Sequence, residues 1–168
     1  MDHKKYQTAL KRIGAAVVDG IVFMPLIFIE QWIFSSVNNL AAVISWLAFS
    51  AFIPIAYSVI LHHKYGQTIG KWVTGIKVVD ISELKNINLK QSIIRDAVCL
   101  TFEVIGLLFF IFLIIQTGKG DYIINDYKNY IGVPFLWWTI IELLTMFTNF
   151  KRRAIHDFMA KSVVIIHK

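Results

Sequence analysis

Four apolar stretches of spanning or near-spanning length constrain the fold of this 168-residue chain more than any other feature. They cover residues 13–34, 40–61, 97–117 and 131–148. A transmembrane helix needs about 20 apolar residues to cross roughly 30 Å of hydrocarbon. Charged residues make up only 17% of the chain, below the share of about 25% in soluble domains. The sequence therefore predicts an all-α integral membrane protein, with a four-helix bundle as a single domain over residues 1–168.

The basic residues predict the orientation of this bundle. Most of the 17 Lys and Arg residues fall in the N-terminal tail, the connection 62–96 and the C-terminal tail. Only Lys119 and Lys128 fall between the third and fourth stretches. Because cytoplasmic segments are enriched in Lys and Arg, we expect both termini and the connection 62–96 in the cytoplasm of a multi-pass cell-membrane protein. Anionic lipid headgroups are the expected partners of these residues, and nucleic acid is not, since no recognisable binding module is present.

The connection and the C-terminal tail share a pattern of a short amphipathic segment followed by a β-branched run. In the connection, a short interfacial helix at Thr68–Thr74 precedes a strand at Ile76–Val79. In the tail, Ala154–Ala160 precedes Ser162–Ile166. We expect the two strands to pair, and Lys71 to face the headgroups while Ile69, Trp72 and Val73 face lipid. The similarity indicates either an internal repeat or only the general likeness of such segments.

Three of the apolar stretches carry a carboxylate seven to nine residues from a basic residue at the expected inner interface. The pairs are Arg12 with Asp19, Arg95 with Glu103, and Lys151 with Glu142. At about 1.5 Å per residue, the three acids lie at a similar depth of about 10–14 Å. Glu30 and Asp96 share helix faces with Asp19 and Glu103, respectively, and would extend a polar track.

Acids in hydrocarbon survive only with a partner, a proton or a wet cavity. Clustered carboxylates hinder one another's ionisation, so they hold a shared proton or a cation. Asp19, Glu103 and Glu142 are therefore our candidates for an ion or proton site. The alternative is structural: Asp19 in an ion pair, and the two glutamates hydrogen-bonded to hydroxyl groups that join the helices.

Several segments together resemble the RDD family of small membrane proteins, named for one arginine and two aspartates. They are Arg12-Ile-Gly-Ala-Ala-Val-Val-Asp19, Gly66-Gln-Thr-Ile-Gly-Lys71, Gly75-Ile-Lys-Val-Val-Asp80, Arg95 and His156-Asp157. The resemblance runs from Arg12 to about Val164. The motif positions it implies are Arg12, Asp19, Gly66, Gln67, Gly70, Lys71, Arg95, His156 and Asp157, with Asp80 as the rival of Asp157 for the second aspartate. Trp72 departs from the family, where a basic residue more often follows the Gly-Lys pair.

The resemblance implies a bacterial membrane protein with a role in transport. Our leading hypothesis is a small transporter of monovalent cations or protons with Asp19 at its centre, working as a homo-oligomer because four helices make a thin wall for a conduit. The competing hypothesis is a non-transporting membrane adaptor or scaffold that binds lipid headgroups or a protein partner. An enzyme is not expected, because no complete nucleophile–base set, metal site or cofactor motif is visible in the sequence.

Overall fold

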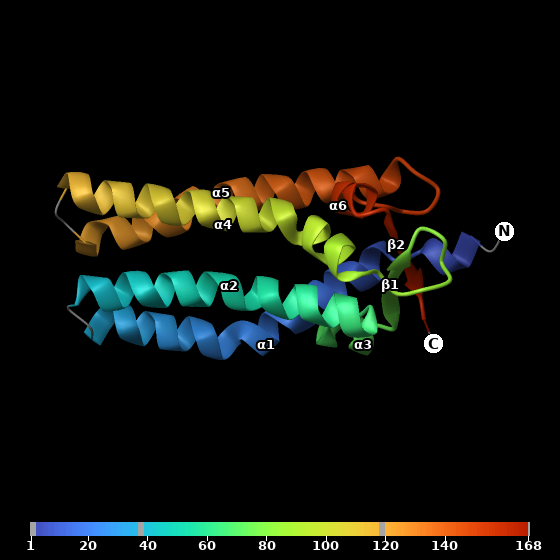
Figure 1. The fold of residues 1–168 in the computed structure, drawn as a ribbon, viewed down its shortest axis with the longest axis horizontal. Helices are drawn as coiled ribbons and strands as arrows, with labels where there is room; N and C mark the ends of the chain where they lie inside the picture. The colour runs from blue at the N-terminus through green and yellow to red at the C-terminus, as the bar shows by residue number, and fades with distance from the viewer. Residues whose placement is uncertain (1–2, 37–38, 118–119, 168) are drawn as a thin grey trace.

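Four long helices run side by side along the long axis of the protein (Figure 1). The computed structural model describes residues 3–36, 39–117 and 120–167. The long helices are α1 (Ala9–Ser36), α2 (Leu40–Tyr65), α4 (Leu89–Thr117) and α5 (Gly120–Phe147). The short elements are η1 (His3–Tyr6), α3 (Ile69–Val73), β1 (Ile76–Asp80), α6 (Ile155–Met159) and β2 (Ser162–Ile166). All the short elements and both chain ends lie at one end of the bundle (Figure 1).

Within the described part of the chain, three helical segments are long and apolar enough to cross a membrane: Lys4–Ile33, Ala41–Tyr65 and Leu89–Gln116. In the fourth long helix the apolar part is shorter, Gly132–Phe147. Large apolar side chains such as Phe28, Leu108 and Trp137 are exposed on the outside of the bundle. Apolar residues on the outer face of a bundle suit lipid as the solvent. The four-span count and the cytoplasmic position of the termini stay predictions.

Two of the helices begin well before the predicted spans. Helix α4 begins at Leu89 because Asn88 caps it: Asn88 Oδ1 accepts from Gln91 N at 2.8 Å, and Gln91 Oε1 accepts from Asn88 N at 3.0 Å. Helix α5 begins at Gly120, eleven residues before the predicted span 131–148. A polar sequence can continue a helix outside the hydrocarbon.

The centre of the bundle is an apolar cluster shared by α2 and α4. Val43 and Leu47 of α2 pack against Leu107, Phe110 and Ile114 of α4, and all five are buried. Close packing at this contact fixes the rotation of the two helices about their axes. It therefore decides which of their polar residues face inward.

The predicted strand pair forms at the end of the bundle. Strand β1 pairs antiparallel with β2, with Ile76 opposite Ile166, Val78 opposite Val164 and Asp80 opposite Ser162. Val78 and Val164 are fully buried, together with Ile76. The pairing satisfies the backbone groups of both segments and ties residues distant in the sequence into one platform.

The two halves of the chain repeat one order of elements: long helix, long helix, short helix, strand. Before the short helices, Thr68 and Ala154 have nearly the same backbone angles (φ −79°, ψ 173° and φ −81°, ψ 170°). After them, Gly75 and Lys161 both have positive φ, 66° and 49°. The similarity seen in the sequence is therefore a structural repeat.

Candidate functional site

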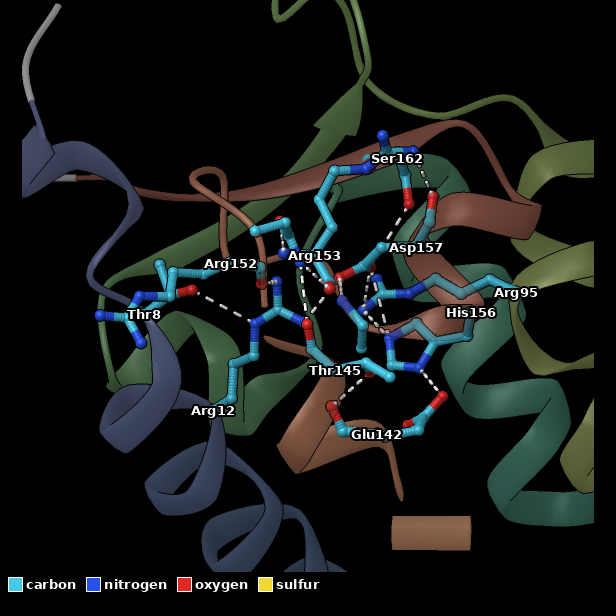
Figure 2. Close-up of polar contacts among 12 residues, drawn as sticks. Thr8, Arg12, Arg95, Glu142, Thr145, Arg152, Arg153, His156, Asp157 and Ser162 are labelled. Atoms are coloured by element: carbon cyan, nitrogen blue, oxygen red, sulfur yellow. Dashed lines mark hydrogen bonds and ion pairs between the residues drawn. The ribbon is translucent and has the colours of Figure 1, made fainter. Parts of the chain in front are cut away.

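A fully buried carboxylate, that of Asp157, lies at the centre of the end platform (Figure 2). Its Oδ2 accepts from Arg12 Nη1 of α1 at 2.6 Å and from the backbone N–H of Ala154 at 3.1 Å. Its Oδ1 lies 3.3 Å from Arg95 Nη2 of α4. One side chain of α6 thus joins the first helix of each half of the chain.

The contacts of Asp157 extend through the neighbouring His156 to Glu142 of α5. Nδ1 of His156 contacts Oε1 of Glu142, and Arg95 Nη2 lies 3.0 Å from His156 Nε2 (Figure 2). Burial raises the pKa of Asp157, but Arg12, His156 and Arg95 outweigh burial and hold that pKa well below its usual range. Burial lowers the pKa of His156, whereas Asp157 and Glu142 bring it above its ordinary value. The cluster is a continuous ion-paired network across four helices.

The basic run after α5 is also part of this network. Arg12 Nη2 donates to the carbonyl oxygen of Arg152 at 3.1 Å. Arg153 donates to the carbonyl oxygens of Ser162 at 2.9 Å and Asp157 at 3.0 Å. These bonds hold the turn into α6 in place, so Arg153 serves the fold as well as the positive charge of the tail.

Asp19 lies at a second polar site, between α1 and α3. Its Oδ1 accepts from the Tyr57 hydroxyl at 2.8 Å and the Gly70 backbone N–H at 2.8 Å, and its Oδ2 accepts from the Thr68 hydroxyl at 2.7 Å. A Cβ on Gly70 would lie 2.1 Å from the carbonyl oxygen of Ala15, so only glycine permits this approach. Asp19 therefore docks the start of α3 onto α1. Among the described residues no ion pair reaches it.

Lys71 does not face the headgroups as predicted but is half-buried. Burial, followed by the nearby charge of Arg95, lowers the pKa of Lys71 to about 8. The exposed residues of α3 are those expected to face lipid, and Trp72 is 71% exposed. In the structural repeat Lys71 stands where α6 has Asp157. Arg95 of α4 thus pairs with the aspartate of α6, and its charge also acts on the lysine of α3.

The loop after α2 explains the remaining motif residues. Gly66 ends α2 with φ 72°, and a Cβ there would lie 2.7 Å from the carbonyl oxygen of Val78. Gln67 Nε2 donates to the carbonyl oxygen of Ile76 at 2.9 Å. Both residues connect α2 to β1, so their positions in the motif have a structural reason.

Of the two aspartates that competed for the second family position, Asp157 is the one that contacts Arg12. Asp80 lies at the end of β1, where its carboxylate accepts from Ser82 N at 3.0 Å and Gln91 Nε2 at 2.7 Å. The Ser82 backbone bond, followed by the Gln91 bond, lowers the pKa of Asp80 to about 2. The Asp80 side chain thus closes the turn after β1 and connects β1 to the first turn of α4 through Gln91.

A cavity of about 690 Å³ lies between α1, α2, α4 and α5. Its wall is mostly apolar, but it includes three carboxylates, those of Glu30, Asp96 and Glu103. Among the described residues, Oδ2 of Asp96 is buried without a hydrogen-bond partner. Of the three acids predicted to form a site, Glu103 lines this cavity, whereas Asp19 binds α3 and Glu142 contacts His156.

The predicted acids are therefore not brought together into one site. Their depth was inferred from the distance to a basic residue, but the direction of each side chain depends on the rotation of its helix. His62, which directly follows the predicted span 40–61, is a buried α2 residue whose Nε2 is without a partner among the described residues.

Glu83 is a residue that sequence reasoning missed. Its carboxylate accepts from Lys5 Nζ at 2.7 Å, the Tyr6 hydroxyl at 2.7 Å and Lys151 Nζ at 2.6 Å. Burial raises the pKa of Glu83, but the bonds from Lys151, Lys5 and Tyr6 outweigh burial and hold it at about 2. Glu83 thus joins both terminal segments to the loop after β1.

Apolar outer faces, span-length helices and an ion-paired platform at one end define a multi-pass integral membrane protein. The sequence model of the RDD family matches residues 6–161, nearly the whole chain. The chain belongs to the RDD family. Neither the curated proteins nor the solved structures contained a match to it.

Proposed function

We propose that this protein moves a monovalent cation or a proton across the membrane, with the carboxylates of the four-helix cavity as its binding site. The observation that carries the proposal is the cavity of about 690 Å³ whose wall includes Glu30, Asp96 and Glu103. Ionisable groups within a membrane bundle are costly and typically line pathways for ions or protons.

The hydrogen bonding of the acids supports a division of roles. Asp157 and Asp19 are fully engaged by protein donors, which suits a structural role. Asp96 keeps a buried oxygen without a protein partner among the described residues, which suits an exchangeable ligand. We therefore assign Glu103 and Asp96 to the site, and we assign Asp19 and Glu142 to holding the helices around it.

The proposal includes a setting for the protein. It is a non-enzymatic protein of the bacterial cell membrane, its platform faces the cytoplasm, and its basic residues contact anionic headgroups. It functions as a homo-oligomer, because the exposed apolar sides of a thin bundle can pack against a second copy.

Flux measurements in proteoliposomes test the proposal. Sodium, potassium and proton flux would be compared for the wild type, Glu103→Gln, Asp96→Asn and the control Asp80→Asn, which keeps an acceptor oxygen at the turn. We expect both cavity variants to lose most of the flux and the control to keep it. Equal flux from wild type and Glu103→Gln, with each variant folded, would refute the role of the cavity.

A second candidate, the membrane adaptor, is favoured by one observation. Ile69, Trp72 and Val73 of α3 are exposed at the platform end. An amphipathic helix with such a face binds at a lipid interface or to a partner. The adaptor predicts that Trp72→Ala abolishes binding to anionic vesicles or to a partner, and that Glu103→Gln changes nothing that can be measured.

A further inference from the structure

The cavity between α1, α2, α4 and α5 has two kinds of wall. Apolar side chains from all these helices except α4 line it, including Phe23, Leu47 and Phe135. The carboxylates of Asp96 and Glu103 come from α4, and that of Glu30 comes from α1. Its volume of about 690 Å³ lies in the range of roughly 300–1,000 Å³ that is typical of sites for organic small molecules.

The spacing of the acids does not suit a divalent metal ion. Asp96 and Glu103 are seven residues apart on one helix, or about 10 Å along its axis. A dehydrated divalent cation such as Ca²⁺ needs about six or more oxygen ligands at short distance. Among the residues that the structure describes, no three acids, histidines or cysteines come close enough to hold a metal ion. Each acid can therefore pair with a charged group by itself.

The aromatic wall is well supported. Phe23 packs edge-on against Tyr57 with ring centroids 5.0 Å apart, and Phe135 packs on Phe102 at 5.9 Å. A wall held in this way offers ring faces and edges to an apolar body, and aromatic faces also attract cations. The buried oxygen of Asp96 without a protein partner among the described residues offers a place for a charged head.

We propose that the cavity binds an organic monovalent cation, whose apolar, ring-bearing body packs against Phe23, Leu47 and Phe135 while its charged head pairs with Glu103 or Asp96. This inference rests on the proposed function, since it names the class of cation, but binding can be tested without transport. The two carboxylates at different depths provide successive pairing positions along α4 for a single charged head.

The test uses the full-length protein in detergent and radiolabelled methyltriphenylphosphonium, with protein-free micelles as the blank. We expect saturable binding that neutral triphenylphosphine oxide displaces at least about tenfold less effectively than unlabelled methyltriphenylphosphonium, and that excess sodium or potassium does not displace. Glu103→Gln or Asp96→Asn should weaken binding about tenfold or more, and Phe135→Ala should also weaken it. Asp80→Asn, outside the cavity, should bind as the wild type does.

The outcomes separate the inference from the proposed function. If the neutral oxide competes equally well and Glu103→Gln has no effect, the cavity is an apolar site and the inference is wrong. If sodium or potassium binds in a Glu103-dependent way while the phosphonium does not, the inference is wrong but the proposed function stands. If the phosphonium binds as expected but no cation is transported in proteoliposomes, the inference stands and the proposed function fails.

Discussion

The sharpest prediction concerns Asp157, whose carboxylate is buried between two arginines. Asp157→Asn keeps the shape of the side chain but leaves Arg12 and Arg95 buried without a counter-charge. Removing one partner of a buried ion pair costs about 3–5 kcal/mol. Because the Arg12 contact is short, at 2.6 Å, and a second arginine also loses its partner, we expect a loss of about 4 kcal/mol in the free energy of unfolding.

The assay is denaturant-driven unfolding of the purified protein in mild detergent, followed by tryptophan fluorescence. Arg12→Gln alone should also be strongly destabilising. The double variant should lose about 2 kcal/mol less free energy of unfolding than the sum of the two single losses, because two interacting residues are then removed together. Asp80→Asn is the matched control, with an expected loss below about 1 kcal/mol, since its bonds lie at an exposed turn. An Asp157→Asn protein within 1 kcal/mol of the wild type, or a double variant whose loss is the plain sum of the two, would refute the reasoning.

The same centre predicts a dependence on pH. Burial raises the pKa of Asp157, but the charges of Arg12, His156 and Arg95 outweigh burial and hold the folded-state pKa well below its usual range. Its ion pairs therefore contribute fully above the unfolded-state pKa of about 4, and the contribution is lost as pH falls through the folded-state pKa. Asp157→Asn should flatten the acid side of the stability profile measured by the same unfolding assay.

Three further predictions concern the docking of α3. Asp19→Asn should lower stability by about 1–2 kcal/mol and speed hydrogen exchange in α3 without reducing flux per folded protein, since the carboxylate binds three protein donors; a loss of flux with unchanged exchange would contradict this. Gly70→Ala should cost roughly 2 kcal/mol or more in thermal or chemical unfolding, because the new Cβ would lie 2.1 Å from the Ala15 carbonyl oxygen; wild-type stability would show that α3 packs differently. Burial near Arg95 lowers the pKa of Lys71 from 10.5 to about 8, so Lys71 binds fewer protons in the folded state than in the unfolded state. The free energy of unfolding should therefore rise between pH 8 and 10. Lys71→Met should remove that rise.

The local elements were largely predictable from the sequence. The short helix at Thr68–Thr74, the strand that follows it, and the equivalent pair in the C-terminal tail all form close to the predicted residues. These elements depend on nearby residues: a capping threonine, a β-branched run, and a residue with positive φ between helix and strand. The pairing of the strands was also predicted correctly, because each has backbone groups that need partners.

The candidate site was predicted less well. The depth of Asp19, Glu103 and Glu142 followed from the helical rise, but depth alone does not say which neighbour a side chain meets. Asp19 meets the backbone of α3, Glu142 meets His156, and Glu103 faces the cavity. Lys71 was expected to face the headgroups from the amphipathic pattern of its segment, yet it is half-buried where α3 docks onto α1.

By itself the amino-acid sequence determined that this chain is a membrane protein of apolar helices, that it resembles the RDD family, and where its short helices and strands form. These features depend on composition and on contacts between residues close in the chain. Only the tertiary structure decided that Arg12 and Arg95 share the carboxylate of Asp157, and that Asp96 and Glu103 line one cavity. The physical reason is that such groupings depend on the rotation and register of helices far apart in the sequence, which are set by packing between α2 and α4 and by the pairing of β1 with β2.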